Sequence, residues 1–200
     1  MSRETNILNS SPVPLLLLLG PSGAGKSTLG IALAKTHNWL HVEIDPLSYA
    51  ARGVPDFAHS WRRLCLEGRF ADLASQMQRQ AIATFRQGVV AVFESMATLT
   101  IEQIASAGRS GLGVVYLFGT EAECLGSFLK REDQTGRKLP EAHWRTCNAK
   151  IFELGRRPGY ESHKLDAFRN GVRRPLDGLI AEVQERCVNL FRRRGVPPSP

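Results

Sequence analysis

The chain has 200 residues, of which 42% are hydrophobic and 22% charged, a balance that excludes a disordered chain or a fibrous repeat and suits about one globular domain. The four cysteines lie far apart and include no Cys-x-x-Cys pair, which excludes a zinc ribbon and a redox motif of that kind. The formal net charge of +7 favours polyanionic partners, a class that includes both nucleic acids and nucleotide phosphates.

The N-terminal region contains a run of five leucines, Leu15–Leu19, that ends at Gly20. The run is too short for a secretory signal or a membrane span, and the charges of Arg3 and Glu4 in front of it cancel. It therefore predicts a strand buried on both faces of a parallel sheet, in a cytoplasmic protein without a membrane segment. Residues 1–13 are expected to form a flexible lead-in.

Apolar periodicity predicts alternating helices and strands along the rest of the chain. Helices are expected at 26–36, 71–87, 101–107, 121–130, 141–154 and 175–190, and further strands at 40–44, 89–93, 113–118 and 163–168. The helix at 71–87 rests on one i, i+4 stripe that includes Leu73 and Phe85, with Gly88 as a stop signal. Such alternation predicts an α/β fold of three layers, with helices on both faces of a five-stranded parallel sheet. One domain is expected over 14–191, followed by a basic, proline-rich and disordered tail at 192–200.

The residues after the first strand read Gly20-Pro21-Ser22-Gly23-Ala24-Gly25-Lys26-Ser27 and match G-x-x-x-x-G-K-[ST], the Walker A motif, in full. Glycines let the backbone turn so that successive N–H groups face one anion, and the helix that starts near Lys26 directs its positive end at the same point. The Lys26 ammonium can reach the β- and γ-phosphates, and the Ser27 hydroxyl can ligate Mg²⁺. The residues expected to bind the nucleotide here are Gly20, Ser22, Gly23, Ala24, Gly25, Lys26, Ser27 and Thr28.

From about residue 14 to residue 190 the sequence resembles the small P-loop kinases, the group of adenylate, shikimate and gluconate kinases. The resemblance implies their fold with a lid segment, ATP and Mg²⁺ as cofactors, and transfer of the γ-phosphate to a small molecule. Kinases of this group carry an acidic residue at the end of the second strand, which orients the acceptor hydroxyl, accepts its proton or holds Mg²⁺ through water. Asp45, 19 residues after Lys26, matches that residue, so catalytic, metal-binding and acceptor-binding roles are expected for it.

A second carboxylate, Glu94, follows the strand at 89–93. A carboxylate at the carboxyl end of a parallel strand points into the crevice where α/β sheets bind ligands, so Glu94 is expected to contact the water shell of the metal or the acceptor. The sequence departs here from a regular Walker B pattern, and a solvent-facing or helix-capping Glu94 is the alternative. The metal site is expected to comprise Ser27, Asp45 and Glu94.

The polar stretch at 131–140 resembles the lid of these kinases, a segment whose arginines close over ATP. A guanidinium that arrives on closure stabilises the negative charge that spreads over the phosphate oxygens during transfer. Arg131 and Arg137 are the expected catalytic arginines, Arg131 is also expected to bind the nucleotide, and Gly136 is expected to give the lid its freedom to hinge. A solvated, charged loop without a catalytic role is the alternative.

Two further sites are placed by the same resemblance. The stretch at 168–172 occupies the position of the adenine site, and its Asn170 begins an Asn-Gly pair that favours a tight turn. The acceptor pocket is expected between 49 and 80, where arginines suit a carboxylate or phosphate on the acceptor. Trp61 in this region is interpreted as a core residue rather than a stacking surface. The residues expected to bind the acceptor are Asp45, Arg52, Arg62, Arg63 and Glu94.

Three functions remain open from the sequence. The favoured one is an ATP-dependent kinase that acts on a hydroxyl of a small polar metabolite, such as a sugar acid. The second keeps the fold but has a nucleotide or nucleoside as acceptor. The third is a nucleotide-dependent protein that binds nucleic acid through the segment 130–174, which holds 12 Lys and Arg against 6 Asp and Glu. Nucleic acid is the least favoured partner, and the sequence leaves the oligomeric state open.

Overall fold

The computed structural model describes residues 13–45, 55–136 and 139–192, and side chains up to residue 186. The expectations for the lead-in at 1–13 and the tail at 192–200 therefore lie almost entirely outside the described residues. Arg52 and Arg137 also lie outside them. No helix in the described part of the chain is both long enough and apolar enough to cross a membrane.

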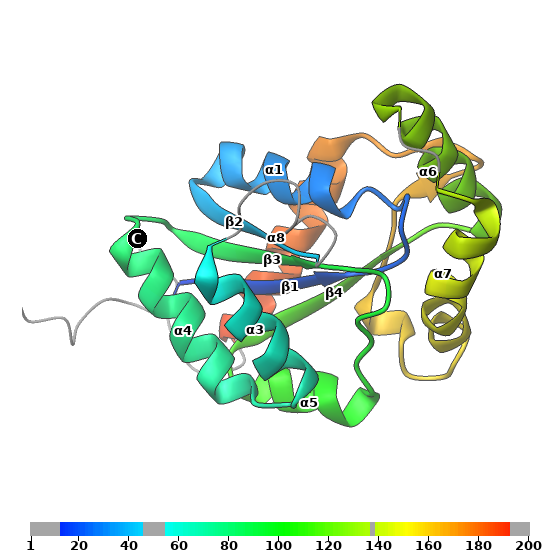
Figure 1. Ribbon diagram of the computed structural model, residues 1–200. Coiled ribbons are helices and arrows are strands. Elements are labelled where there is room, and N and C mark those ends of the chain that lie inside the picture. Colours follow the sequence, from blue (N-terminus) through cyan, green and yellow to red (C-terminus); the bar gives the residue numbers. More distant parts are fainter. Residues whose placement is uncertain (1–12, 46–54, 137–138, 193–200) are drawn as a thin grey trace, which may run out of the picture.

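The centre of the protein is a five-stranded sheet in the order β2-β3-β1-β4-β5, and every neighbouring pair is parallel (Figure 1). The middle strand β1 (Leu15–Leu19) lies between β3 (Gly88–Phe93) and β4 (Leu112–Phe118), and all residues of these three strands are buried. The edges are β2 (Trp39–Ile44) and β5 (Lys164–Asp166). Burial on both faces explains why the inner strands are continuous apolar runs rather than alternating ones.

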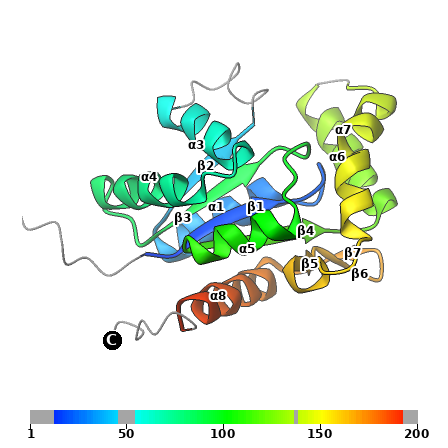
Figure 2. The ribbon, with the colours of Figure 1, turned by 90° about the horizontal axis from the view of Figure 1, so that it is seen from below.

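Helices cover both faces of the sheet. On one face lie α1 (Lys26–His37) and α8 (Leu176–Arg192), and on the other lie α3 (Asp56–Leu66), α4 (Phe70–Ala83) and α5 (Ile101–Arg109) (Figures 1 and 2). The predicted three-layer α/β fold with a parallel five-stranded sheet is therefore confirmed.

A pair of helices, α6 (Glu121–Thr135) and α7 (Glu141–Gly155), stands beyond the carboxyl ends of the strands (Figures 1 and 2). The helix predicted to end at residue 130 continues to Thr135, and Gly136 ends it with a φ of 69°. Much of the predicted lid is thus helical, because the polar residues after 130 extend a helix whose buried face continues through Phe128 and Glu132. Of the strand predicted at 163–168, only 164–166 form β5. The residue before β5 ends a 3₁₀ turn (Glu161–His163), and residue 168 begins a hairpin of β6 (Phe168–Arg169) and β7 (Val172–Arg173).

The prediction missed one helix and misplaced the end of another. The missed helix is α3, and its Trp61 is fully buried, as expected of a core residue. Helix α4 ends at Ala83, four residues earlier than predicted, and Phe85 is 89% exposed with a φ of 54°. Gly88 does not stop this helix but begins β3, where an added Cβ would come within 2.6 Å of the Trp39 ring.

Candidate active site

The Walker A loop connects β1 to α1 at the carboxyl edge of the sheet. It needs its glycines for space as well as for conformation: Gly20 and Gly23 have φ angles of 136° and 93°, and an added Cβ would meet backbone carbonyl oxygens of Leu117 and Cys124 at 2.1 and 1.9 Å. Helix α1 begins without a capping side chain and without an acidic residue in its first turn. Its first N–H groups and its positive end are therefore available to an anion.

Lys26 lies at the mouth of this loop and is 8% exposed. Its ammonium donates hydrogen bonds to the carbonyl oxygens of Gly20 at 2.7 Å and Pro21 at 3.1 Å. Burial lowers the pKa of Lys26 to about 8, against the opposing effects of nearby Glu43 and Asp45. The loop thus holds a buried cation that interacts electrostatically with Glu43 and Asp45.

Glu43 belongs to this site, although the sequence analysis assigned it no role. Its carboxylate lies near the Ser27 hydroxyl, which favours its charged form, and 3.1 Å from Nε2 of His41. Burial alone would raise the pKa of Glu43, but the contacts with His41 and Ser27 and the charge of Lys26 outweigh it and lower the pKa. The strand alternation of β2 could have revealed this residue, because Glu43 lies two positions before Asp45, on the same face.

The oxygen-bearing side chains near Lys26 suit a magnesium ion that is bound mainly by phosphate and water, rather than a metal ion held entirely by protein ligands. The described residues include no group of three or more His, Cys, Asp or Glu side chains that could hold a metal ion. Mg²⁺ in phosphotransfer sites usually takes one or two protein ligands and completes its shell with phosphate oxygens and water. The neighbouring side chains of Ser27 and Glu43, with Asp45 near Lys26, fit that requirement.

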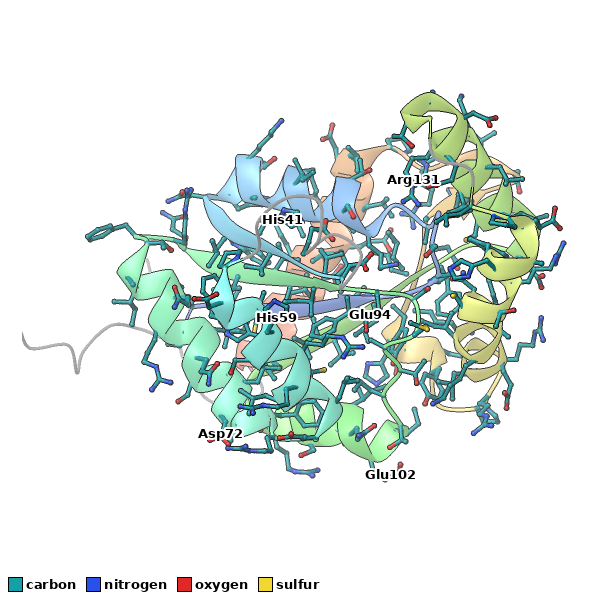
Figure 3. All side chains as sticks on the ribbon, in the orientation of Figure 1. His41, His59, Asp72, Glu94, Glu102 and Arg131 are labelled. Atoms are coloured by element: carbon teal, nitrogen blue, oxygen red, sulfur yellow. The ribbon has the colours of Figure 1, made fainter. Side chains whose placement is uncertain are left out.

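The predicted site residue Glu94, labelled in Figure 3, directly follows β3 and is buried. It pairs with Arg62 of α3. Its Oε1 accepts a hydrogen bond from Nε of Arg62 at 2.9 Å and lies 2.7 Å from Nη2, while Oε2 has no hydrogen-bond partner among the described residues. Arg63 is exposed, because consecutive residues of a helix point in different directions. The structure thus brings Arg62, but not Arg63, to Glu94.

The predicted catalytic residue Arg131 lies on α6 rather than in a loop (Figure 3). Its guanidinium pairs with Oε1 of Glu132 at 3.1 Å and lies over the ring of Phe128, 5.1 Å from the ring centre. It is close enough to Lys26 for its charge to lower the pKa of the lysine. Arg131 is therefore near the phosphate loop but held by residues of its own helix.

Helix α7 forms hydrogen bonds to the Walker A loop through two side chains that were not predicted from the sequence. The Ser22 N–H donates to Oδ1 of Asn148 at 2.7 Å, and the indole N–H of Trp144 donates to the Ser22 carbonyl oxygen at 3.1 Å. Asn148 and Trp144 are each only 1% exposed, and the Asn148 amide also donates to the Trp144 carbonyl at 2.7 Å. The helix that follows the predicted lid is thus tied to the backbone of the phosphate loop.

Replacing Asn148 with Leu is expected to lower the free energy of unfolding by about 1–3 kcal/mol, because the Ser22 N–H would lose its buried acceptor. Denaturant unfolding of the purified variant measures this loss. Thr146→Leu is the matched control, since Thr146 is exposed on the same helix. An equal loss in both variants would contradict a specific role of the Asn148 contact.

The hairpin of β6 and β7 reaches the same loop from another side. Arg173 donates to the carbonyl oxygens of Ala24 at 2.9 Å and Gly23 at 2.8 Å, and its guanidinium lies 4.7 Å from the centre of the Phe168 ring. Asn170 lies at the turn of this hairpin, with a φ of 52°, and is exposed. The tight turn expected at this position is present, but it is Arg173, which the sequence analysis did not select, that contacts the phosphate loop.

Comparison with known proteins rests on structure alone, because no family model and no curated protein matches the sequence. A gluconokinase from Sinorhizobium meliloti 1021 is 18% identical and superposes with a TM-score of 0.51 over 95% of this chain and 100% of its own. A sugar kinase from Janibacter sp. HTCC2649 is 19% identical, with a TM-score of 0.53 over 90% of this chain and 96% of its own. The fold is that of the small P-loop kinases. This confirms the resemblance predicted from the Walker A loop, and at such identity it concerns the P-loop kinase fold only.

A cavity of about 410 Å³ lies between α3, the loop after β3, the start of α5 and α7. Leu66, Met96 and Leu99 give it apolar walls, and α7 contributes Lys150 and the ion pair of Arg157 with Glu153. Of these residues only Leu66 lies within the region predicted for the acceptor pocket. The contribution of α7 could not be read from the sequence, because it depends on how that helix packs.

Proposed function

We propose that this protein is an ATP-dependent small-molecule kinase, which transfers the γ-phosphate of Mg-ATP to a hydroxyl group of a small polar metabolite. The observation that carries the proposal is the placement of Lys26 in a phosphate-binding loop at an uncapped helix N-terminus, close to Glu43 and Asp45. A nucleotide-binding loop supplies the donor phosphate, and a nearby carboxylate supplies the base that an alcohol acceptor needs.

In the proposed reaction, the loop N–H groups and Lys26 bind the phosphate chain, and Ser27 with Glu43 holds the metal. Mg²⁺, when bound, supplies positive charge that offsets the charge of the phosphate oxygens. Asp45 orients the acceptor hydroxyl and takes its proton as the oxygen bonds to the γ-phosphorus. The bond between that phosphorus and the bridging oxygen breaks, and ADP leaves with the electron pair.

The acceptor is proposed to be a sugar acid or a similar polar alcohol. The cavity between α3, α5 and α7 is lined by Met96, two residues after Glu94, has room for a small metabolite and offers Lys150 for an anionic group. The two structural neighbours described above are a gluconokinase and a sugar kinase, which supports the same class. Oε2 of Glu94, buried and without a partner among the described residues, is proposed to accept a hydrogen bond from an acceptor hydroxyl.

The nucleic-acid alternative is less favoured by the structure. Within the basic segment, Arg145 pairs with Glu121 and Glu141, Arg157 pairs with Glu153, and Arg174 pairs with Glu182. These acidic partners offset part of the positive charge that would otherwise attract a phosphate backbone. We propose that the protein acts on small molecules in the cytoplasm.

Transfer of radiolabel from γ-labelled ATP across a panel of acceptors tests the proposal. The panel should contain sugar acids, neutral polyols, nucleosides and nucleoside monophosphates, with an acceptor-free reaction as the control for hydrolysis. Label on a sugar acid or polyol is expected. Label that appears only on nucleosides or their phosphates would instead establish the second function, and label released only as inorganic phosphate would contradict a kinase.

Arg131→Ala is expected to lower kcat by about 10²–10³-fold while the KM for the acceptor changes little, because the guanidinium stabilises charge that develops in transfer. Steady-state kinetics with varied acceptor measures both constants. Arg145→Ala is the control, as Arg145 is also a half-exposed, acid-paired arginine of the α6–α7 pair. An unchanged kcat in Arg131→Ala would remove the arginine from the catalytic machinery.

A further inference from the structure

A short chain of polar side chains connects β2 to the start of α1. Strand alternation places His41 and Glu43 on one face of β2, and Glu43 in turn contacts the Ser27 hydroxyl on α1. Nε2 of His41 lies 3.1 Å from Oε1 of Glu43, and the two side chains are only 17% and 20% exposed. Figure 3 shows His41 on the side of the sheet that α1 covers. The order of contacts is therefore histidine, carboxylate, Walker A serine.

The backbone of α1 fixes the imidazole ring in this position. Gly30 lies directly against it, since an added Cβ at Gly30 would come within 2.7 Å of Cδ2 and 3.0 Å of Nε2 of His41. The Nε2 atom is buried and makes no aligned hydrogen bond to any described residue, and it lies 3.1 Å from Oε1 of Glu43. A ring held in this way restricts the movement of the carboxylate that it contacts.

A glutamate at this position needs such a restriction. The glutamate side chain has several rotatable bonds, and ordering a flexible side chain costs conformational entropy. A carboxylate that is already held between Ser27 and His41 pays this cost on folding rather than on binding. Partners that orient a ligand of a metal in this manner change metal affinity although they do not touch the metal.

We propose that His41 is a positioning residue, which holds the Glu43 carboxylate against Ser27 so that the two groups are pre-arranged for the metal of the bound nucleotide. The inference rests on the proposed function. It gives His41 the role of orienting Glu43, although His41 itself does not contact the nucleotide or its metal. His41 acts through Glu43, so its contribution depends on the presence of that carboxylate.

Calorimetric titration with ATP, in the presence of Mg²⁺ and separately with EDTA, tests the inference without any measurement of catalysis. In His41→Leu, affinity for Mg-ATP is expected to fall about tenfold, while affinity for metal-free ATP stays unchanged. His41→Gln is expected to restore most of the loss, because a glutamine amide can place an N–H near the same point. In a Glu43→Gln background, His41→Leu is expected to have no further effect on Mg-ATP affinity.

His37→Leu is the matched control, since His37 is a half-buried histidine at the opposite end of α1, and it is expected to leave both affinities unchanged. Equal losses of Mg-ATP and metal-free ATP affinity in His41→Leu would overturn the inference, since they would indicate a structural defect. Unchanged Mg-ATP affinity in His41→Leu would overturn it as well. Absence of any ATP binding by the unaltered protein would instead overturn the proposed function, and the inference with it.

Discussion

Lys26→Met is expected to lower kcat/KM for phosphoryl transfer by about 10³-fold or more, which is close to complete loss in an ordinary assay. The ammonium is the positive side chain that lies in the phosphate loop itself, and it is held at the mouth of the loop by the carbonyls of Gly20 and Pro21. Methionine keeps the length and the apolar body of the side chain but removes the charge. ATP affinity, measured by calorimetry, is expected to fall together with the rate.

Lys35→Met provides the control for this substitution, because Lys35 lies on the same helix near its other end and is exposed. It is expected to retain the full rate and full ATP affinity. Thermal unfolding of both variants shows whether a lost activity reflects a lost fold. Retention of the rate in folded Lys26→Met would refute the assignment of this loop as the site of transfer.

Asp45→Asn is expected to lower kcat by about 10²–10⁴-fold while binding of ATP persists, because the amide cannot take the proton of the acceptor hydroxyl. Asp45 directly follows β2 and interacts electrostatically with Lys26, which places it beside the phosphate loop. The shape of the side chain is preserved, so the substitution removes chemistry rather than volume. Single-turnover kinetics at saturating ATP separates the chemical step from nucleotide binding.

Asp166→Asn is the matched control for the proposed base. Asp166 also stands at the carboxyl end of a strand in the same sheet, but on the opposite edge, and is exposed. It is expected to leave kcat unchanged. If Asp45→Asn turned over at the normal rate, proton removal would have to be assigned to another carboxylate of the site, Glu43 or Glu94.

The fold could be predicted from the sequence because its inner strands carry strong local signals. The run Leu15–Leu19 and the strand around Val89–Phe93 are apolar throughout, which is typical of strands that are covered on both faces. Helix α3 was missed although its buried residues Ala58, Trp61 and Cys65 recur at helical spacing, because its arginines were interpreted only as part of an acceptor pocket. Phe85 was misplaced for the opposite reason: it continued a helical stripe in sequence, whereas the chain had already left the helix.

The candidate site was predictable where its residues are consecutive. The Walker A loop is one continuous motif, and Glu43 could have been found by extending the strand alternation back from Asp45. Asn148 and Arg173 could not be found in this way, because they lie 126 and 149 residues from the loop atoms that they contact. Contacts of that range depend on packing between helices and hairpins, and no local pattern in one sequence encodes them.

Calorimetric titration of the unaltered protein with Mg-ATP tests the central claim most directly, namely that the loop around Gly25 binds the phosphate chain of a nucleoside triphosphate. We expect saturable binding at one site per chain, with far weaker binding of AMP, which lacks the β- and γ-phosphates that the loop and Lys26 are placed to hold. No heat of binding for Mg-ATP or Mg-GTP, or equal affinity for AMP, would contradict the claim.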